Sequence, residues 1–306
     1  MTPEYRIPVS SELARALRIT DDTDKHQPAP AQVAMARNAI TGTPAGADLT
    51  GRLAERLRES GWAVLAVPRQ RNDQAFLRVA AGLLAAVGDP FQSVVPPEGG
   101  VWLRGESRRE AGPASLGGFG GQSLHIDAPG VERPPDYTAL LMLRPDPAGG
   151  GACRIANLRQ AAAKLTTVDR ELLSRAVFYE SRADKPRGVG RPRLPFPVLE
   201  PAPDGAGWIR WAGSLPADPR NQQHRPVLLR FGELLEPLTR RIWLSRGHLL
   251  VLDQRQVAHG RDPLGDQRTV KTPKRLLCQA DVRVTAAAPV QQVPAPRADT
   301  DAVSAA

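Results

Sequence analysis

The feature that most constrains the fold is a long series of short apolar runs separated by glycine- and proline-rich turns, beginning near residue 100. Runs of this kind, bounded by turn residues, are typical of β-strands. Many of them at irregular spacing favour a jelly roll, here a mainly β, double-stranded β-helix (cupin-like) with flanking helices. The expected strands are 101–104, 123–127, 137–144, 152–156, 177–181, 195–201, 208–211, 227–231, 249–253, 257–260 and 276–284.

The first third of the chain instead shows helical periodicity. The stretch 46–59 has leucines at positions 49, 53 and 57, and Gly61 follows as a C-terminal cap. The apolar run WAVLAV over 62–67 predicts a buried strand. Asp73 is expected to cap a helix over 73–87, and Ser10 or Ser11 one over 9–18. Further helices are expected at 31–41 and 157–176.

Composition and spacing divide the chain into three parts. Residues 1–45 form an N-terminal extension of helices and loops, residues 46–284 form the β-rich domain, and residues 285–306 are a low-complexity tail expected to be disordered. Within the domain, the basic and glycine/proline-rich stretch 182–194 predicts a mobile loop.

The formal net charge of +9 raises the question of nucleic-acid binding. Only five of the 41 basic residues are lysines, and the arginines are spread along the whole chain. A nucleic-acid interface predicts basic residues clustered on one face with interleaved aromatics. The positive charge is therefore interpreted mainly as a general bias of composition toward arginine, and nucleic acid is not the expected partner.

The cellular setting is predicted from what the sequence does and does not contain. Two cysteines, Cys153 and Cys278, make no disulfide framework, and reduced thiols in the cytoplasm are the expectation. The N-terminus does not resemble a secretory signal, and no apolar run is long enough to cross a bilayer. A small-molecule substrate is therefore expected, while the oligomeric state is left open.

Histidine placement gives the strongest indication of chemistry. The chain has five histidines, and His125 is followed two residues later by Asp127. Residues i and i+2 of a strand point to the same side, so an imidazole and a carboxylate can meet at one point. His259, on a late strand, is the candidate third ligand. Two histidines and one carboxylate form the facial triad that holds Fe(II) and leaves other positions open.

Taken in order, these motifs resemble the TauD/TfdA, clavaminate-synthase-like family of Fe(II)/2-oxoglutarate-dependent dioxygenases. The resemblance rests on HID at 125–127, the glycine-rich turn before ACRIANLR, LSRGHLLVLDQRQVAHGR ending at 261, and KRLLCQ at 274–279. It extends over roughly residues 46–284. It implies that His125, Asp127 and His259 are both metal ligands and catalytic residues, and that 2-oxoglutarate and O₂ are cosubstrates.

The resemblance also implies a cation for the far carboxylate of 2-oxoglutarate. Arg275 matches the family's arginine, and a guanidinium suits the role because its fork pairs with a carboxylate through two hydrogen bonds. Arg261 and Arg268 are less favoured substitutes. The sequence departs from the pattern at Cys153, where the family often has threonine, and at Gln279, where a second arginine is common.

The predicted activity is hydroxylation or desaturation of an unactivated C–H bond in a small polar metabolite. Within the resembled group, an amino acid or a natural-product precursor, as in antibiotic biosynthesis, is the first expectation. Gln122, Ser123 and Arg104 are the candidate substrate-binding residues, by position near the first ligand or in a neighbouring loop. Two alternatives stay open: a nucleotide or other phosphorylated substrate, and a non-catalytic β-barrel that binds a ligand or nucleic acid.

Overall fold

Two β-sheets, placed face to face, form the centre of the molecule in a computed structural model of the full chain. The structure describes residues 5–17, 28–93, 100–180, 194–201, 207–266 and 274–284. Within these residues one sheet has seven strands and the other has four. This mainly β architecture with flanking helices confirms the jelly-roll expectation.

The larger sheet is built around three long strands whose residues are almost entirely apolar. β9 pairs with β2 on one side and β6 on the other, and β6 pairs with β11, all antiparallel. In spatial order its strands are β1 (Arg6–Pro8), β2 (Trp62–Ala66), β9 (His248–Asp253), β6 (Tyr137–Arg144), β11 (Leu276–Arg283) and β3 (Asp89–Phe91), with β4 (Leu103–Glu106) also paired to β11.

The smaller sheet carries two of the three candidate metal ligands. Its strands, in spatial order, are β5 (Gln122–His125), β10 (Val257–Arg261), β7 (Cys153–Asn157) and β8 (Arg240–Ile242). The register sets His259 of β10 directly opposite His125 of β5, although these residues are far apart in the sequence. β-Sheet pairing alone therefore brings the two imidazoles together.

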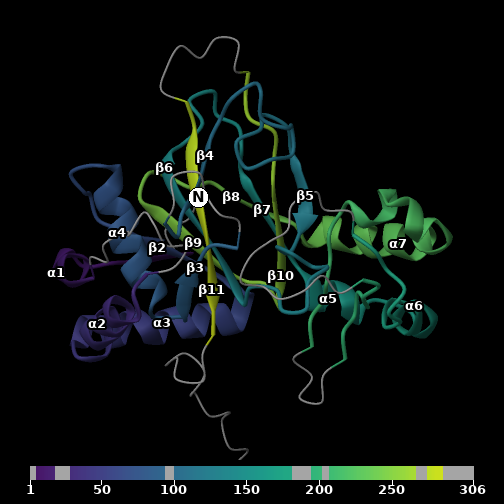
Figure 1. The fold of residues 1–306 in the computed structure, drawn as a ribbon, viewed down its shortest axis with the longest axis horizontal. Coiled ribbons are helices and arrows are strands. Elements are labelled where there is room, and N and C mark those ends of the chain that lie inside the picture. Colours follow the sequence, from purple (N-terminus) through teal and green to yellow (C-terminus); the bar gives the residue numbers. More distant parts are fainter. Residues whose placement is uncertain are drawn as a thin grey trace, which may run out of the picture.

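Helices cover the outer faces of both sheets (Figure 1). The first four pack on the larger sheet and the later ones on the smaller sheet, while a third apolar core fills the space between the sheets. The helices are α1 (Ser11–Ala16), α2 (Pro30–Thr41), α3 (Pro44–Ser60), α4 (Asp73–Leu84), α5 (Leu158–Ala163), α6 (Thr167–Leu173) and α7 (Arg225–Leu235), with short 3₁₀ turns η2 (Leu215–Ala217), η3 (Pro219–His224) and η4 (Glu236–Leu238).

One expected strand is wrong, because residues 227–231 lie in helix α7. The buried positions of α7 include Val227, Phe231 and Leu235, which recur at the four-residue spacing of a helix. A five-residue apolar window is too short to separate this period from that of a strand. The expected strands 177–181, 195–201 and 208–211 form only isolated bridges in the residues described.

Two helix expectations also need correction. The helix predicted over 157–176 is two helices, because Thr166 caps α6 by accepting a hydrogen bond from the Asp169 amide. The cap of α4 is Asn72 rather than Asp73, since the Asn72 side chain accepts from the Ala75 amide. Asp73 occupies the first turn, where its carboxylate interacts favourably with the positive end of the helix dipole.

Two segments singled out in the sequence fall outside the described residues: the predicted loop 182–194, apart from Leu194, and the tail 285–306. The described part of residues 1–45 packs into the main core: β1 extends the larger sheet in parallel with β2. Leu13 and Leu17 of this region are 3% and 0% exposed. Within the described residues, no helix is both long and apolar enough to span a lipid bilayer.

Candidate metal centre

The three predicted ligands converge at one end of the space between the sheets. His125 is the last residue of β5, Asp127 follows it after one residue, and His259 lies in the middle of β10. One side-chain atom from each, a histidine nitrogen or a carboxylate oxygen, lies within 4.8 Å of the other two. The Asp127 carboxylate is 3.7 Å from Nε2 of each histidine. Two imidazoles and a carboxylate on one face suit Fe(II).

The ring of His125 is oriented by its own strand. Its Nδ1 lies 2.8 Å from the Ser123 carbonyl oxygen, which can only accept, so Nδ1 carries the hydrogen. Nε2 is then left with its lone pair facing Asp127 and His259. A metal-binding histidine is usually fixed in one tautomer by a hydrogen bond from the ring nitrogen that does not bind the metal.

Asp127 is held by side chains that come from the larger sheet. Its Oδ2 accepts hydrogen bonds from the Thr138 hydroxyl of β6, at 2.5 Å, and from Nε2 of Gln279 on β11, at 3.1 Å. Gln279, the departure from the family pattern, is thus placed directly against a ligand carboxylate. Carboxylate ligands are commonly oriented by hydrogen bonds of this type.

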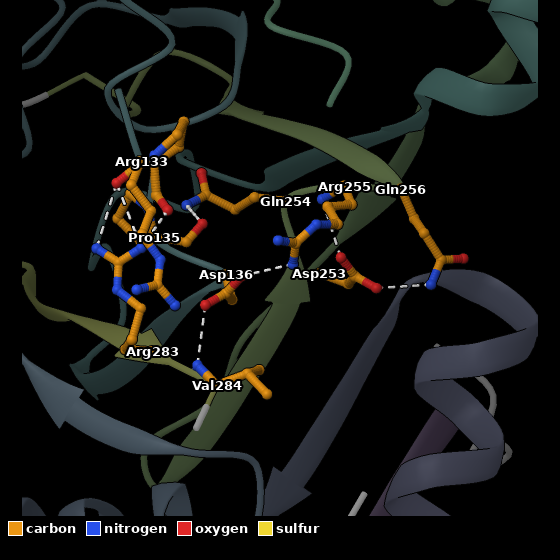
Figure 2. A network of polar contacts seen from close by, with 10 residues as sticks. Arg133, Pro135, Asp136, Asp253, Gln254, Arg255, Gln256, Arg283 and Val284 are labelled. Carbon is orange, nitrogen blue, oxygen red and sulfur yellow. Dashed lines mark hydrogen bonds and ion pairs between the residues drawn. The ribbon is translucent and has the colours of Figure 1, made fainter. Parts of the chain in front are cut away.

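Gln254 fixes the backbone on which Asp127 sits. It is 0% exposed, its Oε1 accepts from the Asp127 amide, and its Nε2 donates to the Pro135 carbonyl at 3.0 Å. Figure 2 shows this side chain within a polar network that joins the β9–β10 turn to the segment 133–136 and the end of β11. In the same network Asp136 accepts from Arg255 and from the Val284 amide.

The residue after Asp127 has an unusual backbone. Ala128 has a φ of 52°, which places it in the left-handed region that costs an L-residue about 1–3 kcal/mol. Its side chain is 1% exposed and packs with Phe91 and Val131. The buried Arg210 donates to the carbonyls of Pro129 and Val131, which ties down the following loop.

Arg275 and Cys153 lie on the interior side of the sheets near this centre. Arg275 is 0% exposed and precedes β11, and its burial lowers its pKa. Cys153 faces the inter-sheet core, and burial raises the pKa of its thiol to about 11. The thiol is therefore neutral at ordinary pH.

The predicted substrate-binding residues are placed less uniformly. Gln122 donates to the Ala114 carbonyl, so its amide holds the preceding loop. Ser123 is exposed beside Gly213. Arg104 is exposed and pairs in register with Cys278, whose side chain packs on the helix-covered face. The register therefore puts Arg104 on the side of the sheet away from Gln279 and the ligands.

Sequence patterns did not reveal the supporting residues Thr138 and Gln254. Neither stands next to a ligand in the sequence, and only the packing of the two sheets against each other places them around Asp127. For Arg261 the sequence does contain a signal of its position near the site. It follows His259 by two residues on the same strand, so the two side chains share one face.

A family model described as "Taurine catabolism dioxygenase TauD, TfdA family" matches residues 33–278. No curated protein sequence is significantly similar to this chain. Solved structures with the same fold include an asparagine oxygenase in complex with Fe(II), 3-hydroxyasparagine and succinate, with a TM-score of 0.70, 22% identity and coverage of 91% of this chain and 93% of that one. Another is the non-heme iron oxygenase OrfP in complex with Fe, succinate and hydroxy-arginine, with a TM-score of 0.68, 14% identity and coverage of 93% and 95%.

Proposed function

Because the chain belongs to the TauD/TfdA family of dioxygenases, we propose that it hydroxylates a free amino acid or an amino-acid-like natural-product precursor. It is an Fe(II)/2-oxoglutarate-dependent dioxygenase. Because the family consists of enzymes, its match argues against the alternative of a non-catalytic β-barrel that only binds a ligand. The observation that carries the proposal is the convergence of His125, Asp127 and His259 within 4.8 Å in a chain of this family.

The donor set fits the metal that the family uses. His125 and His259 supply neutral nitrogen and Asp127 supplies a carboxylate, and the hydrogen bond from His125 to Ser123 leaves Nε2 for the metal. Bound iron with 2-oxoglutarate and O₂ supplies the oxidising power to insert one oxygen atom into a C–H bond, while 2-oxoglutarate becomes succinate and CO₂. Arg275 is the proposed partner of the far carboxylate of 2-oxoglutarate.

The protein's own residues have a positioning role in this reaction. Thr138 and Gln279 hold Oδ2 of Asp127, which directs the carboxylate toward the two histidines. Gln254, in the turn between β9 and β10, fixes the backbone of the same ligand.

The choice of an amino acid is supported by the structural neighbours. Their complexes contain hydroxyasparagine and hydroxy-arginine, and both chains are matched over more than nine tenths of their length. Gln122 and Ser123 remain proposed substrate contacts by their place beside His125. The cytoplasm remains the proposed compartment.

The test is to incubate the purified protein with Fe(II), 2-oxoglutarate and O₂ against a panel of L-amino acids. Succinate and a product heavier by one oxygen atom should appear together for one member of the panel. His125→Ala and Asp127→Ala should abolish both, while His224→Gln, a half-buried residue at the start of α7 that is not among the three ligands, should retain them.

Two other outcomes have separate meanings. If nucleotides rather than amino acids stimulate succinate formation, the enzyme class stands and the substrate proposal is wrong. If 2-oxoglutarate is not consumed under any condition and His125→Ala binds metal as well as wild type, the site itself is wrong.

A further inference from the structure

Two arginines lie buried on the interior side of the sheets near the metal ligands. Arg261 is 2% exposed and follows His259 by two residues on β10, so its side chain shares the face of that ligand. It is directly opposite Cys153 of β7. Arg275 is 0% exposed and acts electrostatically on both Arg261 and Cys153. The two guanidinium groups therefore share one buried region.

Among the residues that the structure describes, both arginines have hydrogen-bond donors without an acceptor. Nη2 of Arg261 donates to the Gly120 carbonyl at 2.6 Å, and Nη1 of Arg275 donates to the Leu116 carbonyl at 3.2 Å. In the described part of the chain, Nε and Nη1 of Arg261 and Nε and Nη2 of Arg275 have no acceptor. Buried donors are nearly always satisfied, and an unsatisfied donor on a charged group is costly.

The charge of this pair is also poorly balanced by the protein. Arg261 and Arg275 are both cations, and the two buried side chains act on each other electrostatically. The Cys153 thiol is neutral, since burial raises its pKa to about 11. Asp146 is the acidic group that acts on both arginines, but its carboxylate accepts from the amides of Ala148, Gly150 and Gly265.

The chain that connects the two arginines adds no negative charge beyond Asp262 and Asp266. Asp262 turns outward to pair with Arg241 at 2.6 Å. A ligand that carries negative charge would therefore satisfy both the free donors and the excess positive charge.

A glycine keeps the backbone clear beside this pair. Gly151, just before β7, has a φ of 74°, and a Cβ placed there would be 2.6 Å from Leu264 Cδ2 and 3.6 Å from Nε of Arg275. Any larger residue would be strained and would press on the side chains that surround the guanidinium. The close approach of this turn to Arg275 thus depends on glycine.

We propose that Arg261 and Arg275 together bind one carboxylate, the far carboxylate of 2-oxoglutarate, so that Arg261 is a second cosubstrate-binding residue. The inference rests on the proposed function. The spacing agrees: His259 and Arg261 are roughly 7 Å apart along the strand. The two carboxyl carbons of 2-oxoglutarate are roughly 5 Å apart when extended.

The test compares two ligands on the Mn(II)-loaded protein by calorimetry, which needs no turnover. 2-Oxoglutarate carries the far carboxylate, and 2-oxovalerate has the same chain length without it. Arg261→Met should weaken 2-oxoglutarate binding by about tenfold or more, because hydrogen bonds to a charged partner are the strong ones, and should leave 2-oxovalerate unchanged. Arg261→Lys should recover part of the loss.

Arg154→Met is the matched control. Arg154 is the neighbour of Cys153 on β7, but it faces outward and pairs with Glu236 at 2.8 Å. It should bind both ligands as wild type does. The ligand-free Arg261→Met protein should melt no lower than wild type, because an unbalanced buried cation is removed.

The proposal is overturned if Arg261→Met binds 2-oxoglutarate with wild-type affinity, or if it loses both ligands equally, as a purely structural role would require. Failure of the proposed function gives a different result. In that case the wild-type protein itself shows no preference for 2-oxoglutarate over 2-oxovalerate.

Discussion

At the scale of single residues, the metal centre depends on side chains that never touch the metal. The three ligands are short and common residue types, and their geometry is set by partners from other strands. Asp127 alone has Thr138, Gln279 and Gln254 around it, each from a different part of the larger sheet or its turns. The supporting residues therefore determine how the ligand carboxylate is oriented.

Gln254→Leu should lower the affinity for Mn(II) or Fe(II) by about 10–100-fold, as loss of a group that orients a ligand generally does. It should also lower the free energy of unfolding by about 1–3 kcal/mol, because the buried Asp127 amide and Pro135 carbonyl lose their partner. Metal titration and urea unfolding measure the two effects.

Gln256→Leu is the control for this change. Gln256 lies two residues later in the same turn and points away from Gln254, donating to Asp253 (Figure 2). It also donates to the Leu57 carbonyl. It should lose stability without losing metal affinity. Equal losses of metal affinity in both variants would contradict the positioning role of Gln254.

His248 predicts an acid sensitivity that is separate from the metal site. It is buried at the start of β9, and its Nδ1 accepts from the Ser245 amide at 2.9 Å. Burial, and then the charge of Arg6, lower its pKa below the usual value. As the pH falls below about 6.5, the unfolded chain takes up a proton before the folded one does, so stability falls.

The measurement is the melting temperature of the metal-loaded protein between neutral and mildly acidic pH. His248→Asn keeps an acceptor for Ser245 but cannot titrate, so its melting temperature should fall less than that of wild type. His224→Asn should follow wild type. If the melting temperature of His248→Asn fell with pH as steeply as that of wild type, His248 would not be the source of the acid sensitivity.

At the scale of elements, α3 shows how one helix end supports the ligand strand. Gly61 ends α3 in the left-handed region, with a φ of 77°, and its amide donates to the Leu57 carbonyl. A Cβ at this position would be 2.7 Å from Cγ1 of Val257, the first residue of β10. The helix cap and the strand that carries His259 therefore meet at one glycine.

Gly61→Ala should destabilise the protein by more than the about 1–2 kcal/mol that the left-handed conformation costs, because the contact with Val257 adds to it. Gly51→Ala is the matched change within the same helix, where a Cβ meets nothing within 4 Å. It should stabilise the protein by about 0.5–1 kcal/mol. Urea unfolding of both variants gives the comparison, and a shift of the same sign in both would contradict it.

At the scale of the whole molecule, the N-terminal segment belongs to the core of the fold. β1 lengthens the larger sheet, and Ile7, Leu13 and Leu17 are almost fully buried. The carbonyl of Leu17 lies so close to α4 that a Cβ at Gly82 would be 1.8 Å from it. The sequence division at residue 45 marked a change in composition, and packing continues across it.

Removing residues 1–29 should therefore give an insoluble or unfolded protein, because several side chains each worth about 1.5–3 kcal/mol of burial are lost. Removing residues 285–306 should leave the melting temperature and metal binding unchanged. Circular dichroism and a solubility assay distinguish the two. A cooperative melt near the wild-type temperature after the N-terminal deletion would contradict the packing argument.

What the sequence determined by itself is local in character. Strand and turn patterns predicted the β-rich class, and the His125–Asp127 spacing with a late His259 predicted the ligands that the fold brings together. The ligand spacing succeeded although β5 ends at His125: Asp127 lies just beyond the strand, where Gln254 and Thr138 hold it. The assignment of 227–231 to a strand failed because so short a window carries no period of its own.

Only the tertiary structure decided which residues surround the ligands and which pairs of charges are buried together. Arg261 and Arg275 share one region because β10 pairs with β7 while the chain before β11 returns beside it. Gln279 faces Asp127 and Arg104 faces away because a strand register fixes every side chain to one face or the other. Register is a property of pairing between distant segments, and no local pattern specifies it.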